Sequence, residues 1–392
     1  MKLLTLDNVD FAGKKVFLRV DYNVVNDGEV TDEFRVRSSL PTIEYLLEQD
    51  CSIILASHNG RPNGRVVDAL SLRPVAKLLP KLLNRDVIFV DNCVGSEVES
   101  EAKYLRTGDI LLLENLRFHK GEEDNDKQFA KDLAALADCY IDDAFAAVHR
   151  AHASIVGVPK ILPHAAGLLL EREYNTITEL MKSPAKPYTA VIGGAKISDK
   201  IEVLNELLKH VNALLIGGAM ANTFLAALGN NMQASLVEKD SFADAKKIIA
   251  AAKRRKVRLL LPSDVVVAKD VNGKKDLRTT KINQLKPQEI TLDLGPETMD
   301  LFNEVIAGSK TVFWNGTLGR AEVPTLAKAS ESLAHAMISS DAKTIIGGGD
   351  TAAYIDGAGL HSHFSFVSTG GGASLELLSG KKLPGIEVLM KK

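Results

Sequence analysis

Hydrophobic runs separated by helical patterns fill the first half of the chain. Short apolar runs that predict strands lie at 14–20, 52–57, 87–90, 109–114 and 139–145. Helical segments fall between most of them, for example at 41–48 and 74–83. Strands that alternate with helices predict an α/β fold, a parallel sheet with helices on both faces.

The second half repeats this pattern and adds glycines. Glycine turns interrupt the apolar stretches 188–211, 213–224, 343–354 and 364–378, whereas 257–267 and 310–319 predict strands without a glycine pair. Because glycine lets a ligand approach bare backbone, four such turns on one sheet edge indicate a binding site. Between the two halves, 166–181 has a helical pattern and predicts a helix that joins two domains.

Two lysines stand out after the first of these glycine pairs. A strand pattern ends at Gly193 and Gly194, and apolar residues at helical spacing follow from Ile201. Lys196 and Lys200, four residues apart, are expected to share a face at the positive end of that helix, where cations are unfavourable. A polyphosphate ligand would explain them, and two solvated surface lysines are the equally open alternative. The stretch matches neither G-x-x-x-x-G-K-[ST] nor G-x-G-x-x-G.

Basic side chains follow the predicted strands of the first half. In an open α/β sheet, ligands bind beyond the carboxyl ends of the strands, so these side chains are expected to converge on one rim. A single arginine there is typical of a surface ion pair, but five favour an anionic ligand. The five are Arg19, Arg35, Arg61, Arg117 and Arg150, accompanied by His58.

Metal sites have weaker support. His149 and His152 have no cysteine or acidic partner at zinc-site spacing, so a metal site is rejected there. Asp350 follows three glycines at a predicted helix start and is a candidate metal or ribose ligand, although an acid there also serves as a helix cap.

Length and composition set the broad class. A chain of 392 residues with 45% hydrophobic and 25% charged residues predicts a globular protein of two domains. The net charge of −2 gives no overall attraction to nucleic acid or membranes. Cys51, Cys93 and Cys139 are expected to be buried, reduced thiols. No signal peptide or apolar run of membrane-spanning length is evident, so we expect a cytoplasmic protein.

The motifs together resemble the phosphoglycerate kinase family over nearly the whole chain. The matching segments are RVDYN (19–23), SHNGRP (57–62), LLLENLRFH (111–119), DDAFAAVHRAHAS (142–154), VIGGAKISDK (191–200), LLIGGAMANTF (214–224), VFWNGTLG (312–319), IIGGGDTA (345–352) and STGGGASLELLSGKKLPG (368–385). The resemblance implies a monomer with two similar-sized, Rossmann-like domains facing each other across a cleft. Residues 1–166 would bind 3-phosphoglycerate, 167–182 would form the interdomain helix, and 183–378 would bind nucleotide. The last segment, 379–392, would pack back on the first domain.

The resemblance also implies a reaction and its residues. A phosphoryl group would move between ATP and the carboxylate of 3-phosphoglycerate, with Mg²⁺ and closure of a hinge. The triose site would comprise Asp21, Asn23, Arg35, His58, Arg61, Arg117 and Arg150. The nucleotide site would comprise Gly194, Ala195, Lys196, Lys200, Gly218, Ala219, Asn315, Glu322, Gly349, Asp350 and Thr351, with Asp350 also on the metal. Arg35, Lys196 and Gly372 (beside Gly371) would act on the moving phosphoryl group.

The chain departs from the family pattern at several positions. The family's WNGPMGVFE appears here as WNGTLGRAE, which changes Thr317, Arg320 and Ala321 in the nucleotide pocket. The family also usually has Leu at Asn59, Asn at Asp142, and Gly at Ala146 and Ala219. Two alternatives stay open: a non-catalytic relative that senses nucleotide or phosphoglycerate, and a dinucleotide-dependent dehydrogenase. The absence of G-x-G-x-x-G argues against the dehydrogenase.

Overall fold

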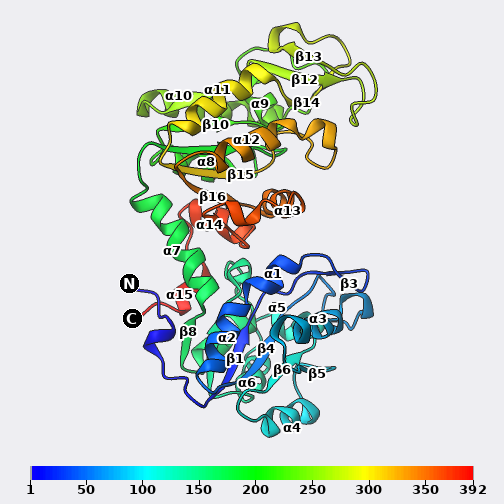
Figure 1. The fold of residues 1–392 in the computed structure, drawn as a ribbon, viewed down its shortest axis with the longest axis vertical. Helices are drawn as coiled ribbons and strands as arrows, with labels where there is room; N and C mark the ends of the chain where they lie inside the picture. Colours follow the sequence, from blue (N-terminus) through cyan, green and yellow to red (C-terminus); the bar gives the residue numbers. More distant parts are fainter. Residues whose placement is uncertain (1, 392) are drawn as a thin grey trace. The chain divides into compact units, whose positions relative to one another are not determined.

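The computed structural model describes residues 2–391 and divides into two compact units (Figure 1). Unit 1 comprises Met1–Thr176 and Lys382–Lys392, and unit 2 comprises Ile177–Lys381. The division falls inside helix α7 (Leu168–Lys182), which occupies the segment predicted to join two domains. Within residues 2–391, no helix is long and apolar enough to cross a membrane.

Unit 1 is built on a six-stranded parallel sheet. Its strand order is β5-β6-β4-β1-β7-β8. Their bounds are β1 (Lys15–Arg19), β4 (Ser52–Ala56), β5 (Ile88–Val90), β6 (Ile110–Leu113), β7 (Cys139–Asp142) and β8 (His164–Ala166). Every residue of β4, β6 and β7 is buried, because helices cover a parallel sheet on its faces and leave no polar side. This explains the near-continuous apolar runs of the sequence.

Short helices and one small hairpin surround this sheet. The hairpin pairs β2 (Val25–Asn26) with β3 (Glu29–Val30). The helices are α1 (Glu33–Ser38), α2 (Leu40–Glu48), α3 (Arg73–Leu83), α4 (Ser96–Tyr104), α5 (Lys120–Glu123) and α6 (Lys127–Ala134). Single turns η3 (Leu116–Phe118), η4 (Phe145–Ala147) and η5 (Ala153–Gly157) follow β6 and β7.

The end of the chain packs on unit 1 beside its start (Figure 1). The Leu4 amide donates to the Leu389 carbonyl at 2.9 Å, and Leu3 forms a bridge with Met390. Helix α15 (Pro384–Val388) brings Gly385 against Val148, whose carbonyl accepts from the Gly385 amide at 2.9 Å. A Cβ at Gly385 would lie 2.9 Å from the Val148 Cα, so only glycine fits this approach.

Unit 2 repeats the architecture with a second six-stranded parallel sheet. Its order is β11-β10-β9-β15-β16-β17. The strands are β9 (Tyr188–Ile192), β10 (Ala213–Ile216), β11 (Arg258–Leu260), β15 (Thr311–Asn315), β16 (Lys343–Gly347) and β17 (Phe366–Val367). The helices are α8 (Ile201–Leu207), α9 (Met220–Ala227), α10 (Phe242–Arg255), α11 (Pro296–Ala307), α12 (Lys328–Ile338), α13 (Gly349–Gly357) and α14 (Gly372–Leu378). The two parallel sheets confirm the predicted two-domain α/β class.

The prediction of one strand over 257–267 was wrong. Two strands occupy it: β11 ends the parallel sheet, and β12 (Asp264–Ala268) is the centre of a separate antiparallel sheet with β13 (Arg278–Lys281) and β14 (Ile290–Leu294). Pro262 lies at the break, where its missing N–H cannot continue a ladder. Asp264 then caps α11, accepting from the Thr298 amide at 2.8 Å.

The three cysteines agree with their prediction. Cys51, Cys93 and Cys139 are buried and free. Burial raises the pKa of all three thiols, to about 12 for Cys139, so they are protonated at neutral pH.

Candidate active site

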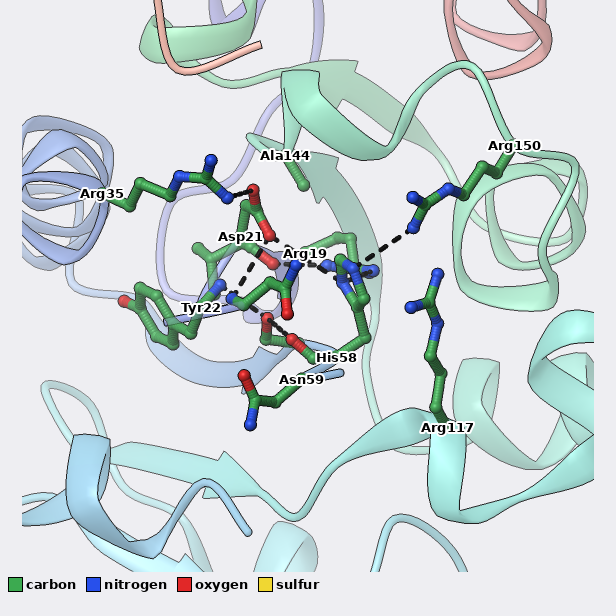
Figure 2. Close-up of polar contacts among 12 residues, drawn as sticks. Arg19, Asp21, Tyr22, Arg35, His58, Asn59, Arg117, Ala144 and Arg150 are labelled. Carbon is green, nitrogen blue, oxygen red and sulfur yellow. Dashed lines mark hydrogen bonds and ion pairs between the residues drawn. The ribbon is translucent and has the colours of Figure 1, made fainter. Parts of the chain in front are cut away.

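The basic side chains of unit 1 gather at the carboxyl ends of its strands (Figure 2). Arg19 ends β1, His58 follows β4, Arg117 lies in η3 after β6, and Arg150 follows η4. They meet because β1 lies between β4 and β7, with Arg19 in register with Ala56 and Asp142. We call these four residues the anion cluster, after the charge of the ligand that they favour.

His58 lies at the centre of the anion cluster between two guanidinium groups. Arg19 Nη2 is 3.1 Å from His58 Nδ1, and Arg150 Nη1 is 3.4 Å from His58 Nε2. Burial and the neighbouring arginines hold the pKa of His58 well below its usual range, so the imidazole is neutral at pH 7. A neutral ring has one donor and one acceptor nitrogen, which limits how it pairs with two cations.

Arg117 adds a nearly buried charge. Its Nη1 donates to the Gly60 carbonyl at 2.6 Å, and its Nε is 3.5 Å from Glu123 Oε1. Burial first, and then Arg150, lowers the pKa of Arg117 to about 10, which still leaves it charged at neutral pH. Burial also lowers the pKa of Arg150. Figure 2 shows Arg117 and Arg150 pointing toward His58. Like charges held this close favour an anionic ligand.

The remaining triose-site residues border this cluster. Arg35, on α1, has its Nη1 3.3 Å from Asp21 Oδ2 and its Nε 3.1 Å from Asp32 Oδ2. The Asn23 side-chain oxygen accepts from the Gly60 amide at 2.8 Å. Arg61 follows this turn and is exposed. The structure thus places all seven predicted triose-site residues around the rim of one sheet.

The predicted nucleotide residues of unit 2 only partly share a cavity. A cavity of about 410 Å³ is lined by six of them: Gly194, Ala195, Gly218, Ala219, Glu322 and Asp350. Apolar walls come from Leu236, Leu294 and Leu318. Gly218 has φ +65° and its Cβ would lie 2.5 Å from the Gly194 backbone, so the floor of the cavity requires glycine there. Lys196, Lys200, Asn315, Gly349 and Thr351 do not line it.

The prediction that Lys196 and Lys200 share a helix face was wrong. Helix α8 begins at Ile201, Lys200 is its N-cap residue, and Lys196 lies in the preceding loop. That loop is tied to Glu238, which accepts from the Ile197 amide and the Ser198 hydroxyl, both at 2.6 Å. Glu238, 41 residues after Ile197, was missed because no local pattern indicates this pairing.

The two lysines have different surroundings. Lys196 is exposed, whereas Lys200 donates to Asn315 Oδ1 at 2.6 Å and to the Gly193 carbonyl at 2.8 Å. Burial lowers the pKa of Lys200 to about 8, and nearby Asp350 opposes that shift. Thr351, beside Asp350, is buried, and its hydroxyl accepts from the Gly316 amide at 2.7 Å.

Glu322, the predicted ribose ligand, is already paired. Its Oε1 is 2.8 Å from Arg320 Nη2, and both residues line the cavity. Arg320 is one of the residues that differ from the family pattern. Its guanidinium therefore adds a positive charge to a pocket that carboxyl groups, those of Asp293 and Asp350, also line.

Two helices of unit 2 begin with predicted site residues. Gly349 and Asp350 start α13, and Gly372 starts α14 with Gly371 as its N-cap residue. Gly349, Asp350 and Gly372 are exposed. Within residues 2–391, no group of three His, Cys, Asp or Glu side chains is placed to hold a metal ion.

Two departures from the family pattern have structural explanations. Asn59 is buried, accepts from the Val25 amide at 3.1 Å and donates to the Val25 carbonyl at 3.0 Å, so it secures the β2–β3 hairpin. Ala219 has φ −65°, which any residue adopts.

Comparison with known proteins places the chain in one family. The family model described as phosphoglycerate kinase matches residues 6–381. The phosphoglycerate kinase of Moorella thermoacetica is 47% identical over 393 residues and that of Desulforudis audaxviator 49% over 390, with at least 99% of each chain covered. The solved phosphoglycerate kinase of Coxiella burnetii superimposes with a TM-score of 0.88 at 37% identity, covering 99% of both chains. The chain therefore belongs to the phosphoglycerate kinase family.

Proposed function

We propose that the protein is a glycolytic phosphotransferase that moves a phosphoryl group reversibly between 1,3-bisphosphoglycerate and ADP, giving 3-phosphoglycerate and ATP. The observation that carries this proposal is the anion cluster, with Arg19, His58, Arg117 and Arg150 at one rim of unit 1. A small, strongly anionic ligand fits such a cluster, because phosphate and carboxylate oxygens accept from guanidinium groups.

Residue roles follow from position and chemistry. Arg117 and Arg150, with Arg61 and His58, would bind the phosphate group of the triose. Asp21 and Asn23 would bind its hydroxyl and carboxyl end. Arg35 would stabilise the transferring phosphoryl group, since its guanidinium is half-buried and oriented by two carboxylates.

The nucleotide belongs to unit 2 in this proposal. Its base would enter the glycine-floored cavity, and Glu322 would contact the ribose after exchanging its bond to Arg320. Lys196, Lys200 and Asn315 would lie along the phosphates. Gly372 would offer its backbone N–H to the moving phosphoryl group at the start of α14.

Mg²⁺ fits the donor set at the start of α13. Asp350 is an exposed carboxylate at the cavity rim, and Mg²⁺ is typically held by one or two carboxylates together with substrate phosphates. The ion would neutralise phosphate charge.

No general base is required for this reaction. The attacking carboxylate of 3-phosphoglycerate is already ionised at neutral pH, so the protein has to position the reactants and neutralise charge. Because the two substrates are assigned to different units, transfer requires a conformation that brings the ligands together. Helix α7 contains residues of both units and is the proposed hinge element.

A coupled assay tests the proposal. The protein is supplied with 3-phosphoglycerate, Mg²⁺ and either ATP or GTP, and the 1,3-bisphosphoglycerate formed is followed through its reduction by NADH. Turnover is expected. The ratio of the turnover rates with ATP and with GTP measures the effect of Arg320 and Thr317 on nucleotide preference. Folded protein that binds 3-phosphoglycerate without turnover would instead support the sensor alternative.

A further inference from the structure

A buried carboxylate, Glu122, lies behind the anion cluster. It is fully buried on α5 and accepts two hydrogen bonds, both from Ser154 of η5. The Ser154 amide donates to Oε2 at 2.9 Å, and the Ser154 hydroxyl donates to Oε1 at 2.6 Å. His152 Nδ1 is 3.8 Å from Oε1, and burial lowers the pKa of His152 to about 3, so that ring carries no charge at pH 7.

Ser154 connects this carboxylate to Arg19. Arg19 is fully buried, and its Nε donates to the Ser154 hydroxyl oxygen at 2.9 Å. The hydroxyl has a single proton. Since a carboxylate only accepts and a guanidinium only donates, that proton must point to Glu122 and the lone pairs to Arg19. The carboxylate therefore orients the hydroxyl so that its lone pairs face the Arg19 guanidinium, which also donates from Nη1 to the Val20 carbonyl.

Arg19 in turn determines the tautomer of His58. Its Nη2 lies 3.1 Å from His58 Nδ1, and a guanidinium cannot accept, so Nδ1 must be the acceptor. The proton of the neutral ring is then on Nε2, the nitrogen that faces Arg150 Nη1 at 3.4 Å. Two donors meet there, and an oxygen of an anionic ligand would accept from both. Asp21 Oδ1 is 3.8 Å from Nδ1 and favours the opposite tautomer.

We propose that Glu122 is a positioning residue which, through Ser154 and Arg19, holds His58 with its proton on Nε2, directed at the anionic triose ligand. The ligand assignment rests on the proposed function; the hydrogen-bond relay does not. Glu122 itself touches no substrate in this proposal.

Glu122→Gln is the central variant. An amide group has one accepting oxygen and one donating nitrogen, so in either orientation a donor faces one of the two Ser154 donors. The glutamine nitrogen then either donates to the Ser154 hydroxyl and competes with Arg19 for its lone pairs, or faces the Ser154 amide, which loses its acceptor, so the present geometry cannot be kept. Ser154→Ala breaks the relay without adding a donor, and Ser154→Thr keeps the hydroxyl.

Two readouts separate positioning from a loss of stability. The first is the ¹⁵N NMR spectrum of the His58 ring, identified by its loss in His58→Asn. In the wild type we expect a protonated Nε2 and a bare Nδ1, and in Glu122→Gln a mixture of tautomers. The second is steady-state kinetics. The KM for 3-phosphoglycerate should rise about tenfold or more, the scale of a hydrogen bond to a charged group, while the KM for ATP is unchanged.

Glu114→Gln is the matched control. Glu114 is also buried, and it also accepts from a serine hydroxyl (Ser71, 2.6 Å) and backbone amides (Leu72, 2.8 Å). This variant should lower stability without altering the His58 tautomer. If Glu122→Gln does not fold, Ser154→Ala carries the test, and Ser154→Thr should restore both readouts.

Three results would overturn the proposal: a wild-type His58 protonated on Nδ1, an unchanged tautomer and KM in both Glu122→Gln and Ser154→Ala, or the same tautomer change in Glu114→Gln. The NMR experiment needs no substrate. Failure of the wild type to use 3-phosphoglycerate would therefore reject the proposed function and leave the relay to be judged by NMR alone.

Discussion

Lys196 and Lys200 occupy the same short segment but are held differently. Lys200 is largely buried and hydrogen-bonded to Asn315, whereas Lys196 is exposed on a loop. The exposed side chain of Lys196 is available to phosphates. We therefore propose that Lys196, rather than Lys200, acts in the transfer step.

Replacement of Lys196 tests that assignment. Lys196→Ala should lower kcat by about 10²–10³, the scale of losing one preorganised electrostatic group, with little change in thermal stability. Lys209→Ala is the control, since Lys209 is exposed just after α8 and forms an ion pair with Glu206. Steady-state assays compare the two variants, and an unchanged kcat in Lys196→Ala would remove the residue from the transfer step.

At the residue scale, the sequence indicates which charged residues belong to a site more reliably than it indicates how their side chains are held. The arginines of unit 1 were predicted to converge because strand ends are recognisable from apolar runs. Glu122 and Ser154 were not identified, since a glutamate in the run KGEED and a serine in RAHAS look like surface residues. Only the packing of α5 against η5 buries them together.

At the element scale, the loop between β9 and α8 depends on one distant carboxylate. Glu238 accepts from Ile197 and Ser198 and thereby fixes the loop that carries Lys196. Glu238→Ala should release the loop and lower kcat about tenfold or more, the scale of hydrogen bonds to a charged acceptor. In the double variant with Lys196→Ala, the second change should have little further effect, because both act through the same side chain. Additive losses would contradict this coupling.

Helix α7 begins on a buried carboxylate. Asp143 Oδ1 accepts from the Leu169 and Leu170 amides at 2.9 and 3.2 Å. Burial raises the pKa of Asp143 from 3.8 to about 7, against the opposing effect of hydrogen bonds such as that from Thr42. Between about pH 4 and 7, the Asp143 carboxyl is therefore protonated in the folded state and ionised in the unfolded chain. Its contribution to stability is lost as the pH rises through about 7.

Asp143→Asn should remove that pH dependence. Between pH 5 and 8, the free energy of unfolding of the wild type should fall relative to the variant by up to about 1.4 kcal/mol per pH unit. Urea unfolding at pH 5, 6.5 and 8 measures the difference, and Asp126→Asn, at an exposed cap of α6, controls for replacement of a capping carboxylate. A constant difference across these pH values would contradict a raised pKa.

Elements were predictable where burial is two-sided and local signals agree. The strands of both parallel sheets except β8 lie in predicted apolar runs, whereas β8 and the antiparallel sheet of β12, β13 and β14 were missed. Strands β13 and β14 are only partly buried and show no continuous apolar run, and the apolar run of β12 was merged with β11 into one predicted strand. Pro262, inside 257–267, argues against one continuous strand there.

At the scale of the whole molecule, the family resemblance supplied what periodicity could not. Apolar runs indicate two α/β halves but do not say which ligand each binds. The return of residues 382–391 to unit 1 depends on contacts across nearly the whole chain, such as Leu4 with Leu389. No local pattern encodes that contact.

The proposed function requires the triose to bind to unit 1 and the nucleotide to bind to unit 2. Isothermal titration of each ligand alone into the wild type, Arg150→Met and Lys200→Met measures whether the two sites are separate. Arg150→Met should weaken 3-phosphoglycerate binding by about 10–100-fold and leave MgADP binding unchanged. Lys200→Met should weaken MgADP binding by a similar factor and leave 3-phosphoglycerate binding unchanged. Two results would contradict separate sites: an equal loss of affinity for both ligands in either variant, or 3-phosphoglycerate binding to Arg150→Met as tightly as to the wild type.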